Sequence, residues 1–106
     1  MLTVMLFAAA AFAQHPAPKN LKVLPPDNLI PTMRAFQSAL GVECDFCHVQ
    51  GDFASDEKHH KEIARDMIKM VQEINGKFPD GKTHVTCYTC HRGATEPATA
   101  WRAIMM

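Results

Sequence analysis

Two short stretches contain every cysteine of this 106-residue chain: residues 44–48 read CDFCH and residues 87–91 read CYTCH. Both follow the pattern C-x-x-C-H, which is the attachment motif of c-type haem. In that chemistry the two thiols form thioethers to the haem vinyl groups, and the histidine binds the iron. The pattern therefore predicts two c-type haems, attached at Cys44, Cys47, Cys87 and Cys90, with His48 and His91 as axial ligands.

Other uses of paired cysteines explain the pattern less well. A zinc site with four sulfur ligands leaves both histidines without a role, and the spacer from Cys47 to Cys87 is longer than in zinc ribbons. Tight C-x-x-C loops make poor structural disulfides. A thioredoxin-like redox pair needs an alternating strand and helix pattern around it, and none is visible.

The chain divides into three parts by composition. Residues 1–13 resemble the apolar core and cleavage region of an export signal, ending in Ala11-Phe12-Ala13, although no Lys or Arg precedes the apolar run. A truncated signal fits this pattern, and a buried N-terminal helix is the alternative. Residues 14–29 form a proline-rich segment, expected as an extended arm, and residues 30–106 form the dihaem domain. Export predicts a periplasmic or extracellular protein.

The size and charge of the chain exclude several function classes. A domain this small has little room for a conventional core, so the apolar residues are expected to pack on the haems. The formal net charge is zero and no basic block is present, which argues against a nucleic-acid partner. The apolar run at the start is too short to span a bilayer, so the mature chain is expected to have no membrane-spanning segment.

Hydrophobic periodicity predicts a mostly α-helical fold with little or no sheet. One helix is expected over residues 31–40, with Gly41 as its stop. A second is expected from Ser55 or Asp56 to the Asn75-Gly76 pair, with Arg65 among the charged residues on its outer faces. A short last helix is expected from about Pro97.

The remaining axial position of each iron decides the function, because Met or His closes it and an open position allows small-molecule chemistry. Met33 precedes the first motif on the helix that leads to it, and Met67 and Met70 precede the second on one helical stripe. By spacing alone, Met33 is equally well a core methionine. The sulfur of either Met67 or Met70 could reach the second iron, and the other side chain would then pack against the ring. His84 is too close to Cys87 to fold back onto the iron, and His59 and His60 are expected in solvent.

Several segments resemble the cytochrome c subunit of photosynthetic reaction centres: residues 33–36, 39–48, 63–75 and 85–93. The resemblance covers about half of that four-haem subunit, and small two-haem c-type relatives are more similar still. In the family a helix with an axial methionine precedes most haem motifs. The resemblance therefore implies that Met33 binds the first iron and that Met70 binds the second, with Met67 as the alternative.

We thus expect an exported dihaem c-type cytochrome that is not an enzyme. It would carry single electrons between a protein donor and a protein acceptor. Two alternatives stay open: a dihaem peroxidase-like enzyme, and a homo-oligomer or filament that forms an extracellular haem chain, in which His15 and the arm bridge neighbours.

Overall fold

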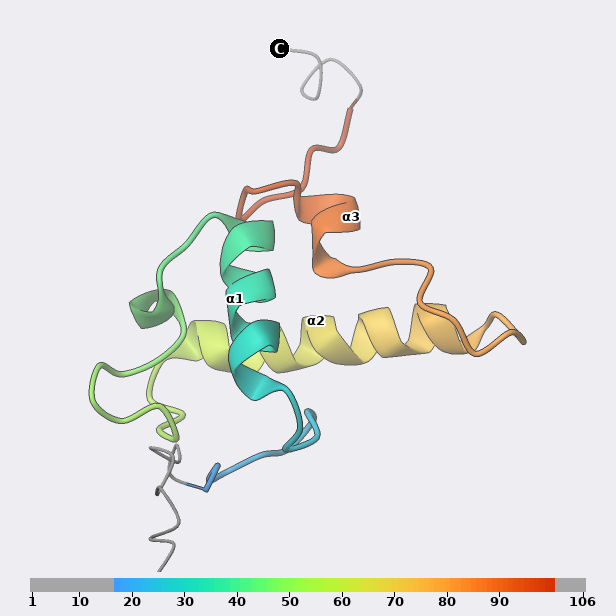
Figure 1. Ribbon diagram of the computed structural model, residues 1–106. Helices are drawn as coiled ribbons and strands as arrows, with labels where there is room; N and C mark the ends of the chain where they lie inside the picture. Colours follow the sequence, from blue (N-terminus) through green and yellow to red (C-terminus); the bar gives the residue numbers. More distant parts are fainter. Residues whose placement is uncertain (1–16, 101–106) are drawn as a thin grey trace, which may run out of the picture.

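The computed structural model describes residues 17–100, and helices dominate this part of the chain (Figure 1). Its elements are listed in chain order: α1 Leu29–Leu40, the 3₁₀ turn η1 Cys44–Phe46, α2 His59–Gly76 and α3 Cys87–His91. Within residues 17–100 the only β pairing is an isolated bridge between Val49 and Asp52. The prediction of a mostly helical fold with little or no sheet is confirmed. The expected export signal lies outside the described residues.

Helix α1 agrees closely with its predicted range. It begins at Leu29, two residues before the expected start, and Pro31 lies in its first turn, where a missing N–H costs no hydrogen bond. It ends at Gly41, whose φ of 65° is left-handed and whose N–H donates to the Gln37 carbonyl at 2.8 Å. A glycine adopts this conformation without steric cost, so the chain turns here toward Cys44.

Helix α2 begins later than predicted. The expected start at Ser55 or Asp56 is wrong, because α2 starts at His59 with Lys58 as its N-cap. The hydroxyl of Ser55 accepts the Glu57 N–H at 3.2 Å, a local bond that holds these residues outside the helix. The end of α2 at Gly76 is as predicted.

The carboxylate of Asp56 ties the segment before α1 to the start of α2. Its oxygens pair with Lys22 at 2.9 Å, Arg65 at 2.9 Å and Lys61 at 3.2 Å, and Asn20 donates to it at 2.9 Å. The prediction that Arg65 lies on an outer face is wrong. Arg65 is only 8% exposed, because Asp56, Glu62 and the Asn20 carbonyl surround its guanidinium.

Helices α1 and α3 make the most extensive contact between elements of the described residues, although they are far apart in sequence. The Gly93 N–H, two residues beyond α3, donates to the Ala39 carbonyl at 2.8 Å. A Cβ atom added at Gly41 would lie 2.2 Å from the Gly93 carbonyl oxygen. Only glycine at position 41 therefore allows the end of α1 and the exit of the second motif to meet.

The amide of Asn75 closes the loop between α2 and α3. Its Oδ1 accepts the backbone N–H groups of His84 and Val85, and its Nδ2 donates to the Val85 carbonyl at 2.9 Å. At the loop tip Phe78 stacks on His84 with ring centroids 3.8 Å apart, and His84 pairs with Asp80. The entry to α3 is thereby held to the end of α2.

Little apolar surface is covered by protein within residues 17–100. Ala39 is the only buried hydrophobic residue there, and the exposed large ones come from every region: Leu21, Ile30, Phe53, Ile63, Met70, Phe78 and Tyr88. No helix in this range is long and apolar enough to cross a membrane. Residues 97–100 are not helical, and the rest of the last predicted helix lies outside the described range.

Gly41→Ala should destabilise the protein far more than Gly81→Ala. Both glycines have left-handed φ angles, 65° and 69°, but a Cβ at Gly81 meets nothing within 4 Å. We expect a loss of about 1 kcal/mol in the free energy of unfolding for Gly81→Ala, from backbone strain. For Gly41→Ala we expect about 2–4 kcal/mol, because the clash adds to the strain. Urea unfolding followed by circular dichroism measures both, and equal losses would contradict the tight approach.

Asp56→Asn should lower the free energy of unfolding at neutral pH and change it little in acid. Hydrogen bonds from Arg65, Lys22 and Asn20 hold the pKa of the Asp56 carboxyl well below its usual range. A carboxyl with a lowered folded pKa contributes stability above its unfolded pKa of about 4, and that contribution disappears as the pH falls through the folded value. The difference in unfolding free energy between the wild-type protein and Asp56→Asn should therefore shrink below about pH 4. A difference that is constant from pH 7 to pH 2 would contradict this role.

Candidate haem-binding sites

The first motif forms a tight turn directly after α1. The Phe46 N–H donates to the Glu43 carbonyl at 3.1 Å and the His48 N–H to the Cys44 carbonyl at 3.0 Å. These bonds wind residues 44–48 so that the two thiols and the imidazole project from one short stretch of backbone. Phe46 stacks on His60, with ring centroids 4.0 Å apart, which anchors the turn to the start of α2.

The imidazole of His48 is held in the tautomer that an iron ligand requires. Its Nδ1 lies 2.9 Å from the carbonyl oxygen of Phe53. A carbonyl only accepts hydrogen bonds, so Nδ1 carries the proton and Nε2 keeps its lone pair. Metal-binding histidines in proteins are oriented by the same kind of bond from the second ring nitrogen.

The second motif occupies α3, a helix of five residues. Thr86 and Thr89 form a capping box at its start, and the Arg92 N–H donates to the Tyr88 carbonyl at 3.1 Å at its end. Arg92 has a left-handed φ of 53°, which turns the chain back toward α1. The Nδ1 of His91 lies 2.9 Å from the Ala94 carbonyl oxygen, so Nε2 of this imidazole is also free to bind iron.

No disulfide joins the four cysteines of the motifs, which are exposed at Cys44 and Cys90 and half-buried at Cys47 and Cys87. Burial raises the pKa of the Cys47 and Cys87 thiols, against a smaller opposing effect of Lys58 on Cys47. Residues 17–100 hold no group of three or more His, Cys, Asp or Glu side chains that could together bind a metal ion.

The surroundings of both motifs fit a large apolar cofactor. A hollow of about 300 Å³ opens beside the first motif and is lined by Glu43, Cys44, Asp45, His48, Gln50 and Phe53. Phe53 is 61% exposed beside His48, and Tyr88 is 60% exposed within the second motif. Each motif therefore presents two thiols and a fixed imidazole, the donor set of a covalent haem, together with one exposed aromatic side chain.

The candidate axial methionines lie on two helices. Met33 is half-buried on α1, and Met67 and Met70 lie three residues apart on α2. Met67 is half-buried, whereas Met70 is 44% exposed. The roles predicted for these methionines stay predictions.

The other histidines of the described residues are placed at the surface. His59 and His60 are the first residues of α2 and both are exposed, as expected. His84 is occupied by its contacts with Phe78 and Asp80 in the loop before α3. His15 lies outside the described range.

Two side chains near the motifs were not recognised from the sequence. Lys61, in the first turn of α2, donates to the same Phe53 carbonyl that His48 contacts. Asn75, assigned only to the end of α2, fixes the backbone that enters the second motif. Both act on backbone atoms, and no side-chain pattern in the sequence marks a carbonyl as a binding partner.

Comparison with known proteins supports the two motifs. The family described as photosynthetic reaction centre cytochrome C subunit matches residues 10–105. The photosynthetic reaction center cytochrome c subunit of Thermochromatium tepidum is 45% identical over 60 residues, which cover 55% of this chain and 15% of that protein. Cytochrome c-554 of Chloroflexus aurantiacus is 43% identical over 61 residues, covering 53% of this chain and 15% of that protein.

A longer match is found with the photosynthetic reaction center cytochrome c subunit of Roseobacter denitrificans, 37% identical over 86 residues. It covers 71% of this chain and 23% of that protein. The chain therefore spans less than a quarter of the length of these relatives.

Proposed function

The chain belongs to the photosynthetic reaction centre cytochrome c subunit family, and we propose that it is an exported c-type cytochrome that carries single electrons through two covalent haems. The observation that supports this most directly is the pair of matched imidazoles, each with Nδ1 bonded to a backbone carbonyl at 2.9 Å. Family membership supports the c-type haem, and the presence of two complete motifs supports a count of two.

In this proposal the protein holds the two haems, orients their histidine ligands and shields the haems from water. The thiols of each motif fix the position of the porphyrin, and the histidine behind them is fixed in one tautomer before it meets the iron. When bound, a c-type haem supplies a reversible one-electron couple at its iron. Exposed side chains beside the motifs, Phe53 and Tyr88, would cover part of its surface and so favour the less charged ferrous form.

We propose His/Met ligation at both irons, with Met33 opposite His48 and Met70 opposite His91. Met33 lies on the helix that leads directly into the first motif. Met70 lies nearer than Met67 to the end of α2 and to the loop that carries Cys87, and its exposed side chain is little used in packing against protein. Thioether ligands raise the potential of a haem relative to a second imidazole.

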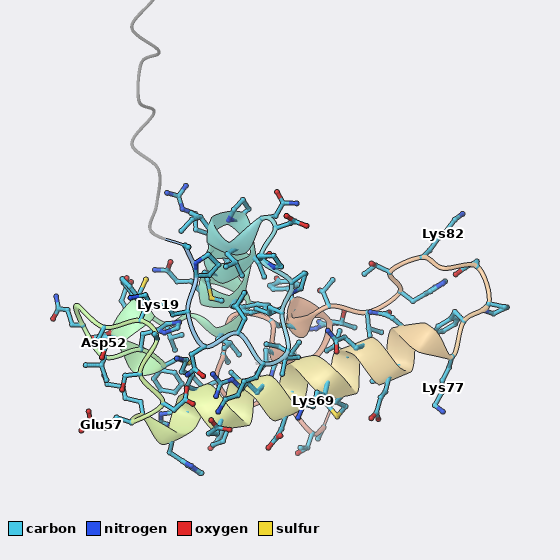
Figure 2. All side chains as sticks on the ribbon, turned by 90° about the horizontal axis from the view of Figure 1, so that it is seen from below. Lys19, Asp52, Glu57, Lys69, Lys77 and Lys82 are labelled. Atoms are coloured by element: carbon cyan, nitrogen blue, oxygen red, sulfur yellow. The ribbon has the colours of Figure 1, made fainter. Side chains whose placement is uncertain are left out.

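The partners are proposed to be a protein donor and a protein acceptor in the periplasm or outside the cell. Exposed charges of both signs are distributed along α2 and its neighbouring loops: Figure 2 shows Asp52 and Glu57 near its start, Lys69 along it, and Lys77 and Lys82 beyond its end. Acidic groups near a helix N-terminus and basic groups near its C-terminus also complement the helix dipole. This distribution suits transient docking to partner proteins.

The haem count tests the proposal. The purified, exported protein should show a pyridine haemochrome spectrum and an intact mass that correspond to two covalent haems. Cys44→Ala and Cys87→Ala should each convert one of them to a haem with a single thioether and a shifted α-band. A protein that contains one zinc ion and has no Soret band would overturn the proposal.

Loss of an axial methionine should open one iron. Met33→Ala should let carbon monoxide bind the first haem, and Met70→Leu should do the same at the second, each removing half of the far-red sulfur-to-iron charge-transfer absorption. Met67→Leu, nearly volume-conserving in the apolar stripe, is the matched control and should leave both irons low-spin. The reverse result for Met67 and Met70 would give the ligand role to Met67.

A further inference from the structure

The carbonyl of Phe53 receives two hydrogen bonds, and one of them comes from a charged side chain. The Nδ1–H of His48 donates to it at 2.9 Å, and the ammonium of Lys61 donates to it at 2.8 Å. Lys61 lies in the first turn of α2, so a residue of another element reaches the bond that orients the first histidine.

The ammonium of Lys61 is held in this place. Its side chain is only 11% exposed, and it also donates to the Ser55 carbonyl at 2.8 Å and pairs with Asp56 at 3.2 Å. All three of its N–H donors are therefore used by fixed acceptors of the same loop. Charge-assisted bonds of this kind are about twice as strong as neutral ones.

A second, charged donor makes the Phe53 oxygen a weaker acceptor for His48. The ammonium withdraws electron density from the carbonyl, so the oxygen polarises the Nδ1–H bond less. An imidazole whose N–H is less polarised donates less electron density through Nε2 to a bound metal. Ferric iron depends on that donation more than ferrous iron does, so the equilibrium shifts toward the reduced form.

The second motif has a simpler arrangement in the part of the chain that the structure describes. The Ala94 carbonyl accepts the His91 Nδ1–H at 2.9 Å, and no charged side chain of residues 17–100 is bonded to it. The two histidines are thus oriented alike but polarised differently.

We propose that Lys61 raises the reduction potential of the haem bound at Cys44 and Cys47 by sharing the carbonyl that orients His48, and so acts as a positioning and tuning residue. This rests on the proposed function, because it needs a haem at each motif. Asp56 and Glu62 offset two of the three positive charges of Lys22, Lys61 and Arg65, so the test has to separate the remaining charge from the bond to the Phe53 carbonyl.

The test compares potentials of the two-haem protein by spectroelectrochemical titration. Lys61→Met should lower the midpoint potential of one haem and leave the other in place. At a fixed ambient potential, the ferric-to-ferrous ratio of that haem should rise by up to about tenfold. A change of this size corresponds to the free energy of about one hydrogen bond. Lys61→Gln keeps an uncharged hydrogen-bond donor, so its midpoint potential should lie between those of the wild-type protein and Lys61→Met. It replaces Lys61→Met in the test if that variant does not accumulate. The shifted α-band of Cys44→Ala identifies the haem of the first motif.

Lys58→Met is the matched control. The Lys58 ammonium donates to the Asp45 carbonyl of the same motif, and its charge acts on Cys47, but it does not contact the Phe53 carbonyl. A shift in Lys58→Met equal to that in Lys61→Met would overturn the proposal in favour of a general charge effect. Equal shifts of both haems, or no shift in Lys61→Met, would overturn it as well. If the haemochrome count differs from two, the proposed function itself fails, which separates the two results.

Discussion

The backbone hydrogen bond from Gly93 to Ala39 is the contact on which the arrangement of the two motifs depends. It joins the residue two places beyond His91 to the last turn of the helix that leads to Cys44. Gly41 leaves room for this approach because it has no side chain. The two motifs are therefore fixed relative to one another through main-chain atoms, which move less than side chains do. Electron transfer between two haems falls steeply with distance, so such a rigid junction suits the proposed function.

The uncovered apolar side chains explain how so small a chain reaches a stable fold. Ala39 is the only buried hydrophobic residue among residues 17–100, so protein contacts alone cover little apolar surface there. Side chains such as Phe53, Ile63 and Tyr88 are instead available to pack on a covalently bound porphyrin. On this account the haem motifs serve both the redox chemistry and the stability of the fold.

The sequence predicted what depends on side-chain type and spacing. The range of α1 and the end of α2 follow from apolar periodicity and glycine stops, and both agree with the structure. The two motifs follow from cysteine spacing. The burial of Arg65 could not be predicted this way, because it depends on Asp56 and on the carbonyl of Asn20, which is distant in sequence. The start of α2 depends on the local bond between Ser55 and Glu57, which the apolar periodicity does not indicate. The Lys61 contact with the Phe53 carbonyl was also missed, since its acceptor is a main-chain atom.

The hydrogen bonds that Asn75 accepts from the backbone of His84 and Val85 separate the loop of residues 77–83 from the second motif. Both ends of residues 77–83 are held at one side chain, so changes in the length or sequence of the tip need not move Cys87. In Figure 1 this loop extends from the end of α2 away from α1 and α3. It is a suitable place to insert a peptide tag or to tether the protein to an electrode. Evolution could vary it in the same way to suit different partners.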